Sequence, residues 1–286
     1  MDRNLAQRIG FAAAATPVAL VLAWYGDWPL AGFLALVAAL GTRELYALAR
    51  RSGADPLELP GLVGAALTPP AVYLLLREPA GPLHGAWPYL AALWLLAVLT
   101  AALRYRAPDR RPLEAVATTT FGVCYAAALP AFMLGLRHQS HGPRSWAGAW
   151  LLFFPLVVTW ICDTAAMFAG RAIGGRKLAP VVSPGKTRAG SVAGVLGGLV
   201  VVPPFHWWIF PAVGVRASLG ALVAIALVVS VVGQAGDLVE SLFKRQAGVK
   251  DSSRLIPGHG GVLDRLDSLY FVVPVSAGLY RALGVG

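Results

Sequence analysis

The stretch from Ser241 to Asp267, SLFKRQAGVKDSSRLIPGHGGVLDRLD, gathers charged side chains and glycines in a chain that is otherwise mostly apolar. Backbone N–H groups at glycines can approach phosphate oxygens, and lysine or arginine can neutralise phosphate charge. Mg²⁺ prefers one or two carboxylates together with substrate phosphates and water. The stretch therefore predicts a polyphosphate held with the help of a divalent cation. Its charged residues and glycines include Lys244, Arg245, Lys250, Arg254, Arg265, Asp251, Asp264, Asp267, Gly258, Gly260 and Gly261.

A second segment with chemical potential begins at Asp163 and continues to Ser191. An acid within an apolar run costs about 2.5 to 3.5 kcal/mol on insertion scales, so Asp163 is expected to face a polar cavity, or else to pair with an arginine. Further along, SPGKT invites comparison with a nucleotide P-loop. That motif needs a glycine five residues before Gly185, where Pro180 stands, so a P-loop is excluded.

A third cluster, GQAGDLVE, ends at Glu240. Asp237, Glu240 and Lys244 follow one another at spacings of three and four, which favours an amphipathic helix. Asp264 and Asp267 are also three apart, and we expect them on one face of the helix that enters the last apolar run.

The integral-membrane phosphatidate cytidylyltransferases, also called CDP-diacylglycerol synthases, have a signature that the first stretch resembles without a departure. The resemblance is carried by Ser241, Lys244, Arg245, Lys250, Asp251, Pro257, His259, Gly260, Gly261, Asp264, Arg265 and Asp267. It implies a reaction of CTP with phosphatidate that gives CDP-diacylglycerol and pyrophosphate. The segment from Asp163 to Ser191 resembles a second block of the same family.

The resemblance also implies roles for individual residues. We predict that Asp237 and Asp264 meet and hold Mg²⁺ against the CTP phosphates, with a second cation possible; salt bridges from these acids to Lys244 or Arg265 are the alternative. Asp267 would support the metal site or orient Arg265. The remaining residues predicted in catalysis are Lys244, Arg245 and Lys250.

Substrate contacts are expected from the same two blocks. Lys186 is the first candidate for binding phosphate, and ordinary basic loop residues are the alternative reading for any one of its neighbours. His259 is expected to hydrogen-bond a phosphate, because phosphatidate is already ionised near neutral pH and needs no general base. The other predicted substrate-binding residues are Ser183, Thr187, Arg176, Asp163, Gly260, Gly261, Asp251 and Arg265, with Asp251 alternatively a loop-structuring residue.

Composition assigns the chain to the membrane proteins. Of its 286 residues 57% are hydrophobic and 13% charged, and the mean hydropathy is +0.65; apolar runs of membrane-spanning length recur throughout. The fold class is predicted to be all-α, a single polytopic membrane domain of residues 1–286 with about nine transmembrane helices. Their expected ranges are 9–25, 29–41, 61–76, 86–103, 113–136, 147–168, 190–210, 217–236 and 269–283, the second being short enough to be tilted or partly re-entrant.

The distribution of basic residues predicts the orientation. With the N-terminus inside, the outer segments hold only Arg77, Arg137, Arg144, Arg216 and Arg281 of the 24 lysines and arginines. This positive-inside bias predicts a multi-pass protein of the cell inner (plasma) membrane whose active-site loops are cytoplasmic, where CTP is available. Phosphatidate would enter from the membrane lipids of the inner leaflet.

Other functional classes fit less well. The net charge of +10 raises nucleic acid as a partner, but basic loops facing anionic headgroups explain it better, and no nucleic-acid partner is expected. Another metal-dependent lipid or polyprenol phosphotransferase or kinase would share the setting, although the D-x-x-D-G-x-x-A-R pattern of the CDP-alcohol phosphotransferases is absent. A transporter should place its charges at mid-membrane depth, whereas these lie mainly in inner loops. A homodimer is expected from the family resemblance alone.

Overall fold

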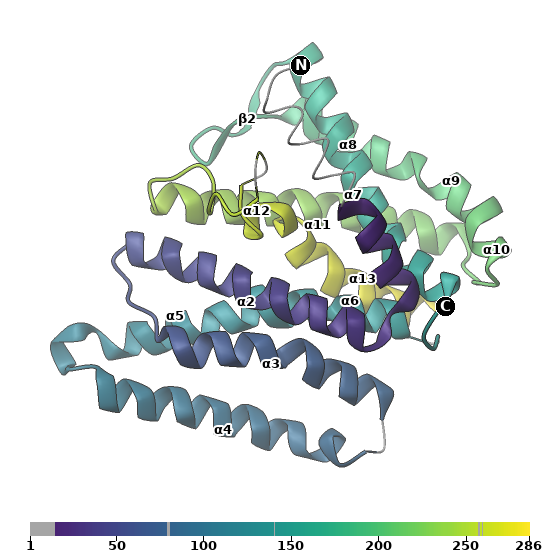
Figure 1. Ribbon diagram of the computed structural model, residues 1–286. Coiled ribbons are helices and arrows are strands. Elements are labelled where there is room, and N and C mark those ends of the chain that lie inside the picture. The colour runs from purple at the N-terminus through teal and green to yellow at the C-terminus, as the bar shows by residue number, and fades with distance from the viewer. Residues whose placement is uncertain (1–14, 79–80, 140, 257, 259) are drawn as a thin grey trace. The chain divides into compact units, whose positions relative to one another are not determined.

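The computed structural model describes residues 15–78, 81–139, 141–256, 258 and 260–286, and most of them are helical (Figure 1). Within these residues, seven helices are long and apolar enough to cross a membrane. This confirms a polytopic, helical membrane protein. They span Asp27–Arg51, Glu58–Arg77, Gly85–Tyr105, Pro112–His138, Trp146–Ile173, Arg188–Ala212 and Leu219–Gln246.

The predicted number of nine spans is not confirmed. The described part of the first is a short apolar helix, Ala15–Tyr25, and the predicted residues 9–14 lie outside the described residues. The last, α13 (Leu269–Leu283), has 15 residues. At 1.5 Å per residue it covers about 22 Å, less than the hydrocarbon core of about 30 Å.

The second span is longer than predicted, because α2 runs from Asp27 to Arg51 over 25 residues. The prediction ended this span at Gly41. The helix continues because this segment is rich in helix-forming residues and packs inward, with Glu44 and Tyr46 both buried. A tilted or re-entrant short span is therefore not needed.

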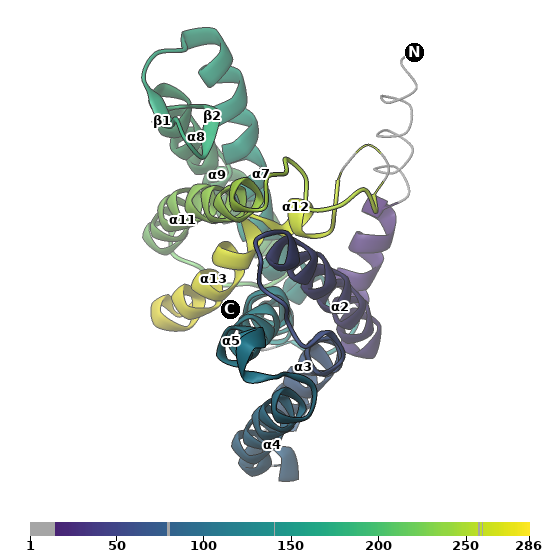
Figure 2. The same ribbon diagram turned by 90° about the vertical axis from the view of Figure 1, so that its left-hand side faces the viewer.

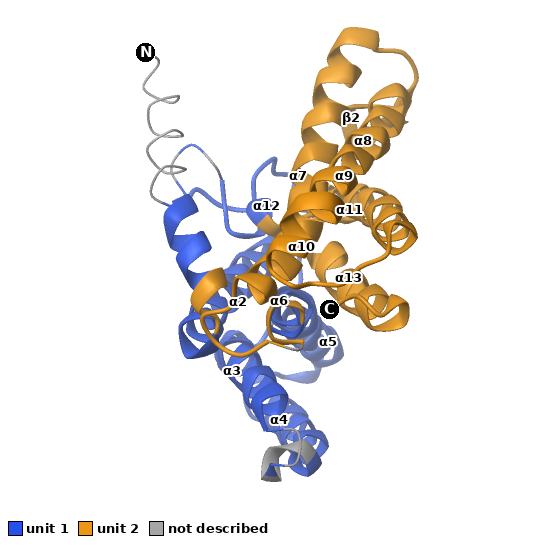
Figure 3. Ribbon diagram, turned by 90° about the vertical axis from the view of Figure 1, so that its right-hand side faces the viewer, with its two compact units in different colours: residues 1–22, 27–135, 246–265 blue, residues 23–26, 136–245, 266–286 orange. Residues whose placement is uncertain are grey.

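The chain divides into two compact units (Figure 3). Unit 1 comprises residues 1–22, 27–135 and 246–265, and unit 2 comprises residues 23–26, 136–245 and 266–286. Each unit is built from segments distant in the chain, and the single domain of residues 1–286 stays a prediction.

Unit 1 is a helical bundle in which α2 packs on α3 (Glu58–Arg77), and α3 packs on both α4 (Pro82–Tyr105) and α5 (Pro112–Val123). A short 3₁₀ turn, η1 (Pro108–Arg110), joins α4 to α5, and a π-helical turn, η2 (Cys124–Ala128), continues α5 into α6 (Leu129–His138). The centre of the bundle is Tyr46, fully buried, whose hydroxyl donates to the carbonyl of Thr119 at 2.7 Å. A Cβ on Gly61 or Gly122 would lie 2.0 and 2.3 Å from this ring, so glycine lets α3 and α5 close around it.

Unit 2 is built on α7 (Trp146–Ile173), α8 (Arg188–Val200) and α11 (Leu219–Gln246), with α13 packed against α7. Between α8 and α11 the chain passes through α9 (Val202–Pro204), a π-helical turn η3 (Phe205–Ile209) and α10 (Phe210–Ala212). Small residues bring α7 and α8 together: a Cβ on Gly190 would lie 2.6 Å from the carbonyl oxygen of Ala166. Such small-residue contacts are the usual way in which membrane helices approach closely.

A β-hairpin connects α7 to α8, where the sequence predicted only a loop (Figure 2). Its strands are β1 (Lys177–Ala179) and β2 (Ser183–Thr187), paired antiparallel with Lys177 opposite Thr187 and Ala179 opposite Ser183. Thr187 then caps α8, because its hydroxyl oxygen accepts from the N–H of Gly190 at 3.0 Å. The hairpin therefore holds Lys186 at a fixed register beside the helix start.

Candidate active site

A pocket of about 420 Å³ opens in unit 2 between α7, the hairpin, α8 and α11. Its polar lining comes from the segment Asp163 to Ser191 and from the GQAGDLVE cluster, with Asp163 and Arg171 from α7, Lys186 and Thr187 from the hairpin, and Asp237 from α11. The glycines at positions 170, 185 and 190 also line it. Residues more than 70 positions apart in the chain thus converge on one cavity with both signs of charge.

An ion pair between Lys186 and Asp237 lies at the pocket wall, with Nζ 2.5 Å from Oδ2. Both side chains are about one-quarter exposed. The other oxygen of Asp237 accepts from the Ser241 hydroxyl at 3.3 Å, one helical turn further along α11. The alternative prediction that Asp237 pairs with Lys244 is therefore replaced by pairing with Lys186.

Two more carboxylates act on this ion pair. Asp163 lies close enough to interact electrostatically with Asp237, Asp267 and Lys186. The sequence predicted that this acid faces a polar cavity, and Asp163 does lie in the lining of the pocket. Three carboxylates and one lysine leave an excess of negative charge, which attracts a cation.

Asp267 was predicted to lie on one helix face with Asp264. In the structure it stands in a break between two helices. The short helix α12 (Leu263–Leu266) ends just before it, and α13 begins at Leu269. The N–H of Ser268 donates to Asp267 Oδ1 at 2.6 Å. Burial and then the charge of Asp237 raise the pKa of Asp267 to about 6, against the opposing effects of Ser268, Lys244 and Lys186.

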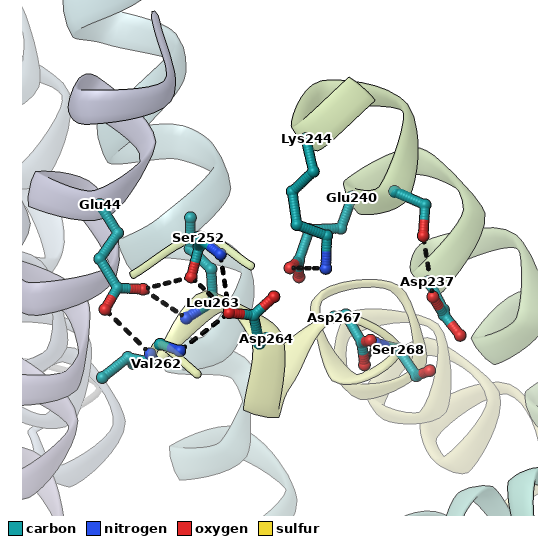
Figure 4. Close-up of polar contacts among 12 residues, drawn as sticks. Glu44, Asp237, Glu240, Lys244, Ser252, Val262, Leu263, Asp264, Asp267 and Ser268 are labelled. Carbon is teal, nitrogen blue, oxygen red and sulfur yellow. Dashed lines mark hydrogen bonds and ion pairs between the residues drawn. The ribbon is translucent and has the colours of Figure 1, made fainter. Parts of the chain in front are cut away.

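The basic pair that follows on α11, Lys244 and Arg245, is not among the residues that line the pocket. Lys244 is 7% exposed and its Nζ lies 2.9 Å from Glu240 Oε1, one turn earlier (Figure 4). Arg245 is exposed, and its Nε donates to the carbonyl of Val182 in the hairpin turn at 3.3 Å. The helical spacing predicted for Asp237, Glu240 and Lys244 is confirmed, since all three lie on α11.

In unit 1, the part of the signature that follows α11, residues 247–265, is the signature loop, and it folds around the carboxylate of Asp264 (Figure 4). Asp264 is 8% exposed, and its Oδ2 accepts from the N–H and the hydroxyl of Ser252 and from the N–H of Gly261, each at 2.8 Å. Gly260 has φ +81°, and a Cβ there would lie 2.7 Å from the same oxygen. Asp264 therefore organises its own loop. Asp237 belongs to unit 2, so the predicted meeting of Asp237 and Asp264 at a metal stays a prediction.

The remaining predicted residues are divided between the two units. Lys250, Asp251 and Arg265 are exposed. The carbonyl of Arg176 accepts from the N–H of Arg188 at 2.9 Å, which closes the base of the hairpin, and Ser183 begins β2. His259, predicted to bind phosphate, lies outside the described residues, as does Pro257 of the signature.

Three polar residues of these sites, Gln234, Glu44 and Ser252, were not predicted. In unit 2, the amide of Gln234 bridges α11 to α8: it accepts from the hydroxyl of Ser191 and donates to the carbonyls of Ser191 and Ser230 at 3.3 and 3.1 Å. In unit 1, Glu44 and Ser252 support the signature loop. Gln234 stands within the GQAGDLVE cluster, so a polar residue in an apolar run was an available signal. Nothing near Glu44 distinguished it from a solvated loop acid.

A divalent metal fits the chemistry of the unit 2 pocket. Carboxylate oxygens are ligands that Mg²⁺ takes, and the shared negative charge near Asp237 favours a cation. Among the residues that the structure describes, no three His, Cys, Asp or Glu side chains form a ready metal site. A metal would therefore complete its coordination with substrate phosphates and water, as that ion commonly does.

Comparisons with known proteins identify the family of the chain. Residues 6–283 match the model of the cytidylyltransferase family. A phosphatidate cytidylyltransferase of Bacillus subtilis is 33% identical over 275 residues, which is 95% of this chain and 96% of the relative. One of Staphylococcus epidermidis is 36% identical, covering 77% and 78%, respectively.

The match to a phosphatidate cytidylyltransferase of Haemophilus influenzae is more local. It is 46% identical over 148 residues, about half of each chain. The two longer matches and the family model nevertheless cover most of the sequence, from before the first described helix into α13. The chain belongs to the cytidylyltransferase family.

Proposed function

We propose that this protein transfers the cytidylyl group of CTP to phosphatidate, giving CDP-diacylglycerol and pyrophosphate for phospholipid synthesis. The observation that carries the proposal is the pocket in which Lys186 pairs with Asp237 beside Asp163, on helices apolar enough to cross a membrane. The full-length similarity to a phosphatidate cytidylyltransferase supports the same substrates.

The chain's own side chains have defined tasks in this reaction. A phosphatidate oxygen forms a bond to the α-phosphorus of CTP, and the bond from that phosphorus to the oxygen bridging the β-phosphorus breaks, so that pyrophosphate leaves. Lys186 and Arg171, both in the pocket lining, would neutralise phosphate charge as it builds up on the leaving group. Catalysis then comes from positioning and charge, because the phosphate nucleophile is already ionised.

Mg²⁺ is the cation that we propose for this site, with Asp237 as its first protein ligand. When bound, it supplies positive charge shared between carboxylates and phosphate oxygens. Asp163 and Asp267 contribute further negative charge around that position. On this proposal Lys186 exchanges its partner when substrate binds, from the carboxylate of Asp237 to a phosphate.

The surroundings of the site follow from the charge bias of the sequence. We propose that the pocket opens to the cytoplasmic side of the plasma membrane. The positive-inside rule places most of the lysines and arginines of the chain on that side. Phosphatidate keeps its acyl chains in the inner leaflet. A homodimer is part of the proposal on the family resemblance alone, and its test is the mass of the purified protein in detergent.

The test uses purified protein in mixed detergent–phosphatidate micelles with Mg²⁺ and CTP labelled with ³²P in either the α or the γ position. Cytidylyl transfer moves α-label into the lipid fraction and releases γ-label as pyrophosphate. A lipid kinase would do the reverse and leave γ-label on the lipid. Omitting phosphatidate or chelating the metal should each abolish transfer.

The Asp237→Asn variant serves as the site control, because it removes one charge from the pocket at nearly constant volume. We expect it to reduce α-label transfer by at least about 100-fold while the protein still inserts and purifies. Transfer of γ-label, or transfer without phosphatidate, would refute the assigned reaction. Full activity of Asp237→Asn would refute the assigned site.

A further inference from the structure

The carboxylate of Glu44, on α2 of unit 1, is buried at 6% exposure and accepts hydrogen bonds from the signature loop on both oxygens (Figure 4). Its Oε1 accepts from the N–H of Val262 at 3.0 Å and from the hydroxyl of Ser253 at 2.7 Å. Its Oε2 accepts from the N–H of Leu263 at 2.9 Å and lies 2.9 Å from the hydroxyl of Ser252. More than 200 residues of sequence separate the acid from the loop that it holds.

These contacts fix both ends of the loop. Ser253 is itself oriented, since its oxygen accepts from the N–H of Leu255 at 3.1 Å while its hydrogen points to Glu44. The Ser252 hydroxyl has one hydrogen and lies 2.8 Å from Asp264 Oδ2 as well, so it donates to one carboxylate at a time. Glu44 keeps at least three donors in either case.

Gly261 explains how the carboxylate comes so close. A Cβ at this position would lie 2.4 Å from Glu44 Oε2 and 2.1 Å from the Ser252 oxygen, well inside any real contact. The glycine is thus required where α2 meets the loop. A carboxylate among helices is costly to bury unless its oxygens are hydrogen-bonded, and here the loop supplies those bonds.

We infer that Glu44 is a positioning residue for the reaction: it anchors the signature loop, which carries Asp264 and Arg265, in its working conformation. The inference rests on the proposed function, because the loop matters to catalysis only if its residues contact the substrates. Glu44 itself touches the loop and is assigned no contact with CTP or phosphatidate. Displacing reacting groups by about 1 Å can cost about 100-fold in rate, so an anchor of this kind should be visible in turnover.

The test compares Glu44→Gln with Glu58→Gln in the full-length protein in phosphatidate micelles. Glutamine keeps the shape of Glu44 but turns one acceptor oxygen into an N–H₂ donor that faces an N–H donor of the loop. Glu58 gives the matched control: it undergoes the same change in unit 1, but it pairs with Arg50 at 2.9 Å on the surface. The kcat and the KM for CTP are measured for each variant. The kcat is expressed per mole of folded protein, and the amount of folded protein is taken from the amplitude of the thermal unfolding transition.

We expect kcat of Glu44→Gln to fall at least about tenfold relative to Glu58→Gln, with the KM for CTP changed less than about threefold. Trypsin gives a second readout that needs no activity, since Lys250 and Arg254 are exposed in the loop. Cleavage there should be several-fold faster in Glu44→Gln. Ser253→Ala removes one donor only and should change both quantities in the same direction by a smaller factor.

The outcomes separate the two proposals. Unchanged kcat and cleavage in Glu44→Gln overturn the anchoring role. If Glu44→Gln does not fold, the test uses Ser253→Ala instead. Equal kcat and equal trypsin cleavage rates in Ser253→Ala and Glu58→Gln would then overturn the anchoring role of Glu44. If wild-type protein transfers no cytidylyl group, the proposed function fails, while faster cleavage in Glu44→Gln would still support the anchor.

Discussion

Replacing Asp267 with asparagine should make the protein more stable at pH 8 and less active. The native carboxylate is charged at a cost, because burial and the neighbouring charge of Asp237 raise its pKa to about 6 from 3.8. Asparagine removes the charge and keeps the oxygen that accepts from the N–H of Ser268. A substitution that stabilises while it inactivates identifies a group retained for chemistry.

The sign and size of the effect follow from proton linkage. In the unfolded chain Asp267 loses its proton near pH 4, whereas the folded protein holds that proton until about pH 6. Folding is therefore penalised progressively as the pH rises through this window, and the penalty is complete above it. A shift of roughly two pH units corresponds to at most about 3 kcal/mol, part of which belongs to Asp237 through their mutual repulsion.

The measurement is the thermal midpoint in detergent for wild type and Asp267→Asn at pH 4 and pH 8, with exposed Asp109→Asn as the charge control. We expect the variant to match wild type near pH 4 and to unfold several degrees higher at pH 8. Wild-type turnover should rise through about pH 6, and turnover of Asp267→Asn should stay low throughout. A midpoint difference that does not change with pH, or equals that of Asp109→Asn, would refute the electrostatic reasoning.

Three further perturbations test other contacts. Lys186→Gln breaks the 2.5 Å ion pair with Asp237. In the transfer assay it should lower kcat/KM by about 10- to 100-fold, which corresponds to one charged hydrogen bond of about 1.5–3 kcal/mol. Gly261→Ala puts a Cβ 2.4 Å from Glu44 Oε2 and should lower activity at least about tenfold, whereas Gly32→Ala, with nothing within 4 Å, should be neutral. Arg137→Met removes the guanidinium that donates to the carbonyls of Trp24 and Gly142 at 2.6 and 3.1 Å. The substitution should lower the free energy of unfolding by about 2–4 kcal/mol in a thermal melt and leave the activity per folded protein unchanged.

The class of fold was predictable because apolar runs and basic loops are long-range averages that do not depend on packing. Element ends were less predictable. The second span was predicted to end at Gly41, but the helix continues through Glu44, which is buried and accepts hydrogen bonds from a loop more than 200 residues later. No local property of α2 encodes that contact.

The candidate site shows the same division. Asp163, Lys186 and Asp237 were selected separately by charge in apolar or glycine-rich surroundings, and all three line one pocket. Their pairing was not predicted, because the salt-bridge partners considered for Asp237 and Asp264 were Lys244 and Arg265. Lys244 instead pairs with Glu240, and the hairpin delivers Lys186 from outside the helix. Sequence spacing identifies neighbours on one element, whereas partners from another element depend on the tertiary fold.

The glycines of the signature loop have a physical reason besides the predicted approach of backbone N–H groups to phosphate, which stays a prediction. In unit 1, Gly260 leaves room for the carboxylate of Asp264, and Gly261 leaves room for the Ser252 hydroxyl and the carboxylate of Glu44. The N–H of Gly261 donates to Asp264, and the absent Cβ leaves room for Glu44. A phosphate and a carboxylate make similar demands on a loop, since both are anions that need several donors at short range. A glycine-rich motif with acids nearby therefore indicates an anion-holding loop, and only the fold reveals whether that anion is a ligand or a side chain.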